Sequence, residues 1–81
     1  MTKKILKFSA SWCQPCKMLA KNLETAQLTV PVEEIDIDEK TDLSVEYKIR
    51  GVPTLVMLED GKEVKRMSGV KSVDELKAWA D

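Results

Sequence analysis

Apolar and polar side chains follow one another along this chain with periods that alternate between those of strands and helices. Residues 4–9 form a short apolar segment typical of a buried strand, with Ile5, Leu6 and Phe8 entering the core. Beyond it, apolar residues recur every three or four positions, which predicts an amphipathic helix that begins near residues 13–15. The stripe that this helix would bury consists of Cys16, Leu19, Ala20, Leu23 and Ala26.

The middle of the chain predicts a strand followed by a short helix. In residues 32–38, two isoleucines alternate with acidic residues, as in a strand with one side in solvent. Residues 43–49 also alternate, but they contain an apolar pair four positions apart, which is a helical spacing. We interpret this segment as a short helix capped by Thr41 or Asp42, because two parallel strands need a crossover between them.

The last third of the chain predicts a hairpin and a final helix. Residues 54–59 are a nearly continuous apolar run, as expected of a central strand that is covered on both faces. Asp60-Gly61 is a strong signal for a two-residue hairpin turn, after which an antiparallel strand should return. Ser72 and Glu75 have the spacing of a capping box and so predict the start of a helix. The inner stripe of that helix would be Val73, Leu76, Trp79 and Ala80.

The element order β-α-β-α-β-β-α predicts an α/β fold, with a four-stranded mixed sheet and helices on both faces. A chain of 81 residues has room for one core only, so we expect a single domain that spans residues 1–81. The net charge of −1 argues against a nucleic-acid partner. No apolar run approaches the ~18–20 residues of a membrane span. Because Lys7 interrupts the first apolar patch, a signal peptide is not expected either. We therefore expect the protein in the cytoplasm. We also expect it to be a monomer.

Both cysteines of the chain, Cys13 and Cys16, lie two residues apart at the start of the first predicted helix. Cys13 should be exposed before the first turn, whereas Cys16 belongs to the buried stripe. In a reducing cytosol, a disulfide between them is more often catalytic than structural. A structural zinc site needs four ligands, usually cysteine and histidine, and the chain has no histidine. The pair therefore predicts thiol–disulfide exchange without a metal or another cofactor.

The two sulfurs would have different roles in this exchange. A thiolate, not a thiol, attacks a disulfide. The N–H groups and dipole at a helix N-terminus favour an anion by ~0.3–1 kcal/mol, and by up to ~2 kcal/mol in good geometry. One pKa unit corresponds to about 1.36 kcal/mol, so the pKa of Cys13 would fall by up to roughly one and a half. Cys13 is thus the expected nucleophile, and Cys16 would resolve the mixed disulfide.

Three separated motifs resemble those of the thioredoxins. They are Trp12-Cys13-Gln14-Pro15-Cys16-Lys17, Arg50-Gly51-Val52-Pro53-Thr54, and Asp60-Gly61 followed by Ser68-Gly69-Val70. The similarity extends from about Ile5 to Trp79. It implies a protein-disulfide reductase with a cis proline at Pro53 facing the redox pair, disulfide-containing proteins as substrates and electrons from an external reductase.

The resemblance also implies a flat, mostly apolar surface around Cys13 on which a protein substrate docks. The residues expected to form it are Trp12, Gln14, Pro15, Val52, Pro53, Gly69 and Val70. The backbone of Val52 could pair with an extended substrate segment.

The chain departs from the family pattern at several positions. It has Gln14 where the family usually has a glycine, and it lacks the N-terminal strand and helix of full-length members. Lys7 occupies the position of the buried aspartate, and Glu34 that of the buried lysine. We therefore hypothesise a charge-swapped pair that affects how Cys16 loses its proton, with Lys17 as a further modulator. If the alignment contained a one-residue gap, Glu33 would take the place of Glu34 in this pair. Alternatively, the Lys7 side chain reaches solvent and takes no part in catalysis.

Two other functions remain open. The short scaffold and Phe8-Ser9 before the motif are typical of a glutaredoxin-like enzyme that uses glutathione. Against that, Trp12 and Gln14-Pro15 depart from the glutaredoxin motif, and Ser72-Val73 stands where acidic glutathione-binding residues are expected. A non-catalytic binding module is the third possibility. The electron donor is accordingly either a thioredoxin reductase or a glutathione-linked system.

Overall fold

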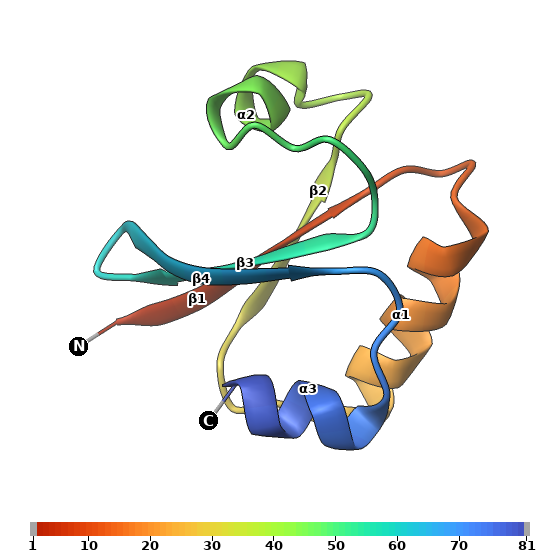
Figure 1. Ribbon diagram of the computed structural model, residues 1–81, viewed down its shortest axis with the longest axis vertical. Helices are drawn as coiled ribbons and strands as arrows, with labels where there is room; N and C mark the ends of the chain where they lie inside the picture. The colour runs from red at the N-terminus through yellow and green to blue at the C-terminus, as the bar shows by residue number, and fades with distance from the viewer. Residues whose placement is uncertain (1, 81) are drawn as a thin grey trace.

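The computed structural model describes residues 2–80, which form seven elements in the predicted order β-α-β-α-β-β-α (Figure 1). The elements are β1 (Lys3–Ser9), α1 (Gln14–Ala26), β2 (Val32–Asp36), α2 (Thr41–Glu46), β3 (Thr54–Glu59), β4 (Lys62–Ser68) and α3 (Val73–Ala80).

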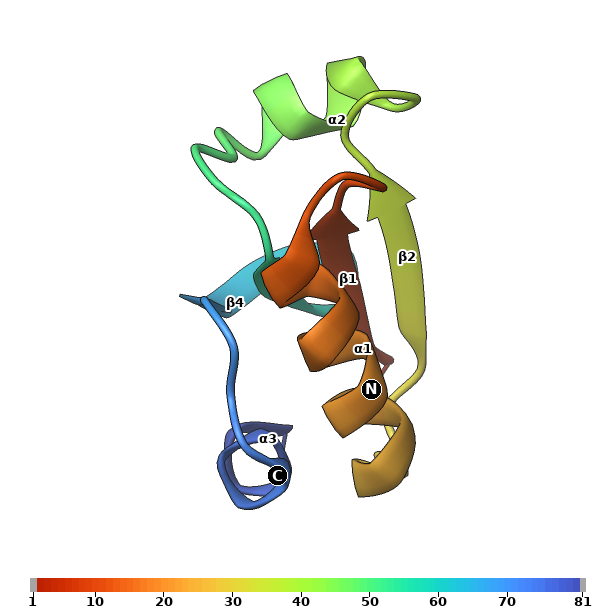
Figure 2. The same cartoon turned by 90° about the vertical axis from the view of Figure 1, so that its right-hand side faces the viewer.

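The four strands form one mixed sheet in the order β2-β1-β3-β4. The β1–β2 pair is parallel, while β3 is antiparallel to both β1 and β4. Figure 1 shows α2 above the sheet and α3 below it, and Figure 2 shows that α1 lies beside α3. The predicted fold, a four-stranded mixed sheet with helices on both faces, is therefore confirmed.

Alternation of side chains along β1 divides the core between the two faces of the sheet. Ile5 points toward α1 and α3, whereas Leu6 and Phe8 point toward α2. The buried cluster under α1 and α3 consists of Ile5, Leu19, Ala26, Leu55, Met57, Leu76 and Ala80. The buried cluster on the α2 face consists of Leu6, Phe8, Ile35 and Val56. Lys7 alternates with Leu6 and Phe8, so this buried basic residue lies on the same face as α1.

Two local predictions near the C-terminus are confirmed. Asp60 and Gly61, at φ values of 53° and 84°, both adopt the left-handed conformation that a tight two-residue hairpin requires. Ser72 Oγ accepts a hydrogen bond from the Glu75 backbone N–H at 3.2 Å, and the Glu75 carboxylate accepts one from Ser72 N–H at 3.1 Å. The bond from the Ser72 backbone is the main reason why the pKa of Glu75 is lowered below its ordinary value. This reciprocal arrangement is a capping box.

The predicted strand over residues 32–38 is two residues too long, because β2 ends at Asp36. There the Asp36 side chain accepts a hydrogen bond from Asp38 N–H at 2.8 Å, and the Asp36 carbonyl accepts one from Lys40 N–H at 2.8 Å. Ile37 N–H still donates to the Ser9 carbonyl of β1 at 2.9 Å, but β1 ends at Ser9, and the local bonds of Asp36 then turn the chain away from the sheet.

The predicted cap of the short helix is also wrong. The residue before the first turn of α2 is Lys40, and neither Thr41 nor Asp42 provides a side-chain cap. The Lys40 carbonyl already accepts the first helical hydrogen bonds, from Leu43 N–H at 3.1 Å and Ser44 N–H at 3.2 Å. Thr41 is therefore inside the first turn, where its hydroxyl cannot cap it.

Candidate redox site

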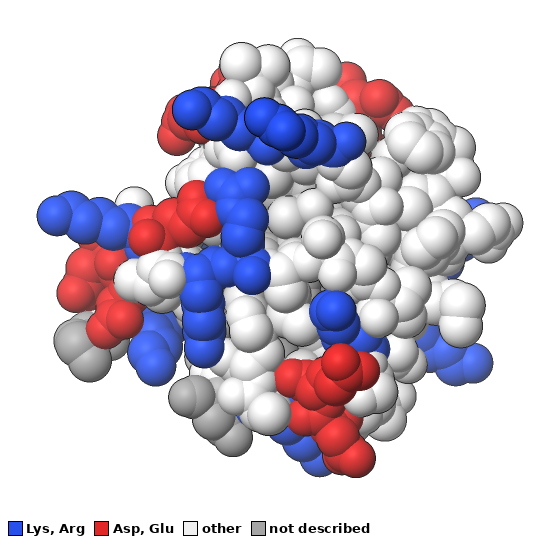
Figure 3. All heavy atoms as spheres, in the orientation of Figure 1, with Lys and Arg blue, Asp and Glu red and all other residues white. Residues whose placement is uncertain are grey.

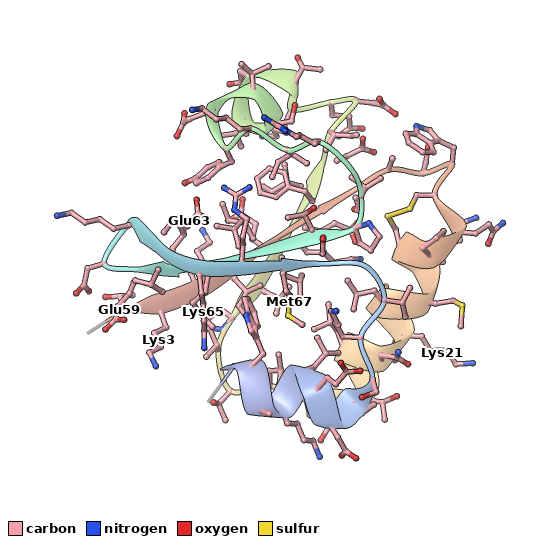
Figure 4. The ribbon with its side chains drawn as sticks, viewed as in Figure 1. Lys3, Lys21, Glu59, Glu63, Lys65 and Met67 are labelled. Atoms are coloured by element: carbon pink, nitrogen blue, oxygen red, sulfur yellow. A yellow bond between two sulfur atoms is a disulfide. The ribbon has the colours of Figure 1, made fainter. Side chains whose placement is uncertain are left out.

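The cysteine pair lies where β1 leads into α1, at the right-hand side of the molecule in Figure 4. A disulfide joins Cys13 and Cys16, whose Cα atoms are 5.3 Å apart. Cys13 is the N-cap of α1, and its Sγ accepts a hydrogen bond from Cys16 N–H at 3.2 Å. Pro15 lies in the first turn, where a missing N–H leaves no bond unmade. The helix terminus therefore directs backbone donors at the sulfur of Cys13.

The expectation that Cys13 is exposed is wrong for this disulfide-bonded form. Cys13 is only 4% exposed and Cys16 only 3%. The disulfide holds the Cys13 side chain in a small apolar cluster with Ala10, against which Val52 packs. In this form both sulfurs are shielded from solvent.

The residues expected to form a docking surface differ in exposure: Pro53 is buried, whereas Gln14, Pro15, Gly69 and Val70 are exposed. Val52 is half-buried against the cysteine cluster, and the peptide bond between Val52 and Pro53 is cis, as the resemblance implies. The Pro53 carbonyl accepts a hydrogen bond from Gly69 N–H at 3.0 Å, which links this loop to the loop after β4. Gly69 has a φ of 86°, a conformation that favours glycine. Val70, the next residue, is 40% exposed.

On the other side of the cysteines, Trp12 is 66% exposed. Its Nε1–H donates to Asp38 Oδ2 at 2.9 Å. This hydrogen bond holds the orientation of the indole ring, which belongs to the loop between β1 and α1. Gln14 and Pro15, between the cysteines, are exposed as well. Exposed apolar surface beside a shielded disulfide is suited to a protein ligand.

Behind the disulfide, the predicted pair of Lys7 and Glu34 is present. The two residues are direct partners in the parallel β1–β2 register, and Lys7 Nζ is 2.8 Å from Glu34 Oε2. The Lys7 side chain is 5% exposed, whereas that of Glu34 is 66% exposed. Lys7 therefore does not reach solvent as in the alternative interpretation. The neighbouring Glu33 pairs instead with Lys4, whose hydrogen bond lowers the pKa of Glu33.

A cavity of about 210 Å³ lies between this ion pair and Cys16. It is lined by Lys7, Ser9, Ala10, Ser11, Cys16, Lys17, Ala20, Glu34 and Asp36. Since one water occupies about 30 Å³, the volume would hold several water molecules. Lys17 thus joins Lys7 and Glu34 in one polar space at the back of the buried sulfur.

Three polar residues of this cavity were not predicted from the sequence: Ser9, Ser11 and Asp36. A signal for two of them was available. Ser9 and Asp36 end the parallel strands β1 and β2 and are direct register partners. The carboxyl ends of adjacent parallel strands lie at one edge of a sheet, where ligand-binding groups commonly gather.

Two features are absent from residues 2–80. No group of three His, Cys, Asp or Glu side chains is placed to hold a metal ion. No helix in that range has the length and apolar character needed to cross a bilayer.

Fold and site together define a small α/β protein with a cysteine pair at a helix N-terminus beside a cis proline. The family model described as Thioredoxin matches residues 1–81, and the chain belongs to the thioredoxin family.

Similar proteins agree with this assignment. A thioredoxin of Chlamydia trachomatis is 39% identical over 75 residues, which cover 89% of this chain and 74% of the relative. The mitochondrial thioredoxin of Mus musculus is 37% identical over 79 residues, which cover 93% of this chain and 48% of the relative. This chain thus spans about half the length of its mammalian curated relatives. The solved structure of a single-site mutant thioredoxin from Halobacterium salinarum NRC-1 is 40% identical with a TM-score of 0.89, covering 96% of this chain and 71% of that one.

Proposed function

We propose that this protein is a thiol–disulfide oxidoreductase that reduces disulfides in other proteins through Cys13 and Cys16. The observation that carries the proposal is the disulfide at the N-terminus of α1, next to the cis Val52–Pro53 bond. Membership of the thioredoxin family supports the same activity.

The reaction has two exchange steps. The Cys13 thiolate attacks one sulfur of a substrate disulfide, and the other substrate sulfur leaves as a thiolate that takes up a proton. Cys16 then loses its proton and attacks Cys13 Sγ, which closes the internal disulfide and releases the second substrate thiol. The substrate gains two electrons and two protons, and the protein gains one disulfide. The N–H of Cys16, which points at Cys13 Sγ in the structure, stabilises the attacking thiolate.

The substrate docks on the apolar surface around the disulfide. The exposed Trp12 and Val70 provide apolar contact area, and Gln14, Pro15 and Gly69 complete the surface. Pro53 contributes no N–H, so the backbone of Val52 is the group that pairs with an extended substrate segment. An apolar surface of this kind suits many substrates, because it needs shape rather than a particular charge.

The second step requires Cys16, which is buried, to lose a proton. We assign this task to the cavity behind it. The buried ammonium of Lys7 stabilises the developing Cys16 thiolate electrostatically, and the exposed Glu34 carboxylate connects the cavity to solvent. Asp36 and Lys17 are the other charged groups that line the cavity, and they contribute opposite charges. The charges of the ion pair are exchanged relative to the family pattern, but a buried charge still faces Cys16.

The cycle needs an external electron donor, which is either a thioredoxin reductase or a glutathione-linked reductant, and no cofactor besides the disulfide. A reducing cytoplasm would keep the cysteine pair available as a dithiol. We propose that residues 1–81 act as one monomeric domain with disulfide-containing proteins as partners, and without nucleic-acid or membrane binding.

Reduction of insulin disulfides tests the proposal. The protein is recycled either by a thioredoxin reductase with NADPH or by glutathione with its reductase, and turbidity from the released insulin chain is followed. Activity with the thioredoxin reductase is the expected result. Activity with glutathione alone would move the protein to the glutaredoxin-like class, and activity in neither system would overturn the proposal.

A further inference from the structure

A groove of about 530 Å³ lies on the same face of the sheet as α2, between the end of that helix and β4. Its lining residues are Lys48, Arg50, Gly51, Thr54, Arg66, Met67 and Ser68. Three of these seven residues are basic and none is acidic. In Figure 3, Lys and Arg side chains form a band below α2 that continues onto the strands. In a chain whose net charge is −1, this local gathering of positive charge is a feature of the fold and not of the composition.

The positive charge of the groove is only partly neutralised. Neither Lys48 nor Arg50 forms an ion pair within residues 2–80. Arg66 donates to both oxygens of Glu63, at 2.5 and 2.7 Å, and to the Tyr47 carbonyl at 2.9 Å. These bonds hold the Arg66 guanidinium in place, and they lower the pKa of Glu63. Arg66 is therefore a fixed side of the groove, and Lys48 and Arg50, which have no ion-pair partner among residues 2–80, supply the net positive charge of the groove.

Lys48 has a left-handed backbone conformation, which favours glycine. Ile49 N–H donates to the Ser44 carbonyl at 2.9 Å, and Lys48 N–H donates to the Val45 carbonyl at 3.1 Å. This is the Schellman ending of a helix, in which the residue in the position of Lys48 is usually glycine. Lys48 has a φ of 54°, so its side chain is kept at a backbone cost.

The groove adjoins the docking surface through the chain itself. Gly51 and Thr54 flank Val52-Pro53, and Ser68 directly precedes Gly69. Val52, which packs against the cysteine cluster, directly follows Gly51 of the groove, so an extended peptide seated at Cys13 would have the groove beside it.

We propose that this groove binds an acidic segment of the protein substrate, next to the disulfide that Cys13 attacks. The inference rests on the proposed disulfide reductase function and adds a charge preference to it. The apolar surface holds the region around the substrate disulfide, while Lys48, Arg50 and Arg66 select substrates with carboxylates a few residues away. Such complementary charges act mainly on the encounter rate and on the choice of partner.

Three synthetic peptides test the charge preference. The three peptides share one sequence with one internal disulfide and differ only in four adjacent residues, which are all glutamate, all glutamine or all lysine. Each peptide is made in two versions, with the four residues before or after the disulfide. Two exposed ion pairs, with Lys48 and Arg50, predict a kcat/KM for the glutamate peptide roughly three- to tenfold above that for the glutamine peptide at low salt, with the lysine peptide slowest. The ratio should approach one in about 0.5 M NaCl, because salt screens exposed charges. Equal rates for all three peptides would overturn the inference.

Two double variants with the same charge change locate the effect. Lys48→Gly with Arg50→Gln removes two groove cations, and glycine suits the left-handed backbone at that position, so the first substitution should not lower stability. Lys3→Gln with Lys21→Gln removes two cations that lie outside the groove (Figure 4). The groove variant should lose most of the glutamate preference and keep its rate with the glutamine peptide. The control variant should keep both, and an equal loss in both variants would overturn the inference.

A binding measurement separates this inference from the proposed function. A Cys13→Ser/Cys16→Ser variant cannot react, so calorimetry with the same peptides reports docking alone. Tighter binding of the glutamate peptide supports the groove even if the native protein reduces none of the peptides, in which case only the proposed function fails. An oligothymidylate of equal charge that binds the variant as tightly would identify a general polyanion site and overturn the inference.

Discussion

The two sides of the Cys13–Cys16 disulfide are built on different principles. In front, Trp12 and Val70 present exposed apolar side chains. Behind, a buried ammonium and an exposed carboxylate share a polar cavity with Cys16. Under the proposed function the front binds protein substrates, for which exposed apolar area supplies the contact. The back has to manage one proton in a shielded place, for which the sign and position of a charge decide the outcome.

Replacing one sulfur at a time gives the largest expected contrast between the two sides. Cys13→Ser should lose all measurable insulin reduction, at least ~10³-fold, because the attacking thiolate is absent. Cys16→Ser keeps the nucleophile but cannot resolve the intermediate, so mass spectrometry should find the substrate attached to Cys13. A Cys13→Ser variant that still turned over would reverse the assigned roles of the two sides.

Altering the ion pair tests whether the back of the site acts through charge. Lys7→Met should slow the alkylation of Cys16 at neutral pH and move its pH profile upward by roughly one unit, because the neighbouring cation is lost. The measurement is made in a Cys13→Ser background, so that only Cys16 reacts. An unchanged profile would remove Lys7 from the mechanism.

Glu34→Gln is the matched change on the other partner. It leaves the buried Lys7 ammonium without a charged partner and should lower the free energy of unfolding by about 1–3 kcal/mol. Lys7→Met leaves only an exposed carboxylate unpaired and should cost less than about 1 kcal/mol. Urea denaturation of both variants measures the difference, and an equal or reversed cost would show that burial of Lys7 does not control the pair.

Removing the front surface should affect binding and leave the sulfur chemistry intact. Trp12→Ala is expected to raise the KM for insulin about three- to tenfold, as for the loss of one aromatic contact. Reduction of the internal disulfide by dithiothreitol should be unchanged. Met18→Ala removes another exposed apolar side chain, 63% exposed on α1, and serves as the control. Equal effects of both variants would argue against a localised docking surface.

The smallest expected effect separates the pH response of the fold from that of the sulfur. The pKa of Glu75 is lowered by its bonds to Ser72, so its stabilising contribution is complete above the ordinary carboxyl value of 4.5 and is lost as the pH falls below it. The lowered pKa values of Glu33 and Glu63 have the same sign. Urea midpoints should therefore fall between about pH 4.5 and 3, and Glu75→Gln should flatten that fall. If the stability difference between Glu75→Gln and the unaltered protein varied with pH between about pH 6 and 8, this assignment would be contradicted.

Elements that depend on nearby residues were predicted well. The hairpin at Asp60-Gly61 and the capping box of Ser72 and Glu75 need only contacts within a few positions, so local signals suffice. The end of β2 was predicted wrongly for a related reason. The partner strand β1 ends at Ser9, opposite Asp36, and local bonds of Asp36 then turn the chain; the alternation of apolar residues does not report where a neighbouring strand ends.

The site was predictable in its chemistry but not in its shielding. The spacing of Cys13 and Cys16 indicated a redox pair, and the resemblance indicated that Lys7 faces Glu34. That Cys13 is buried followed only from its packing with Ala10 and Val52, residues that belong to separate segments. The helical period predicts which residues within a helix are buried, but Cys13 precedes the helix, so the period does not predict its exposure.

By itself the amino-acid sequence determined the order of the elements, the two-faced sheet and the cysteine pair, because period, turn chemistry and spacing act over a few residues. The tertiary structure alone decided which cations share the groove between α2 and β4, since Lys48 and Arg66 lie far apart in the chain. It likewise decided that Lys7 is buried while its partner Glu34 remains in solvent. Exposure and local electric field arise from the packing of distant segments, and only the folded chain brings those segments together.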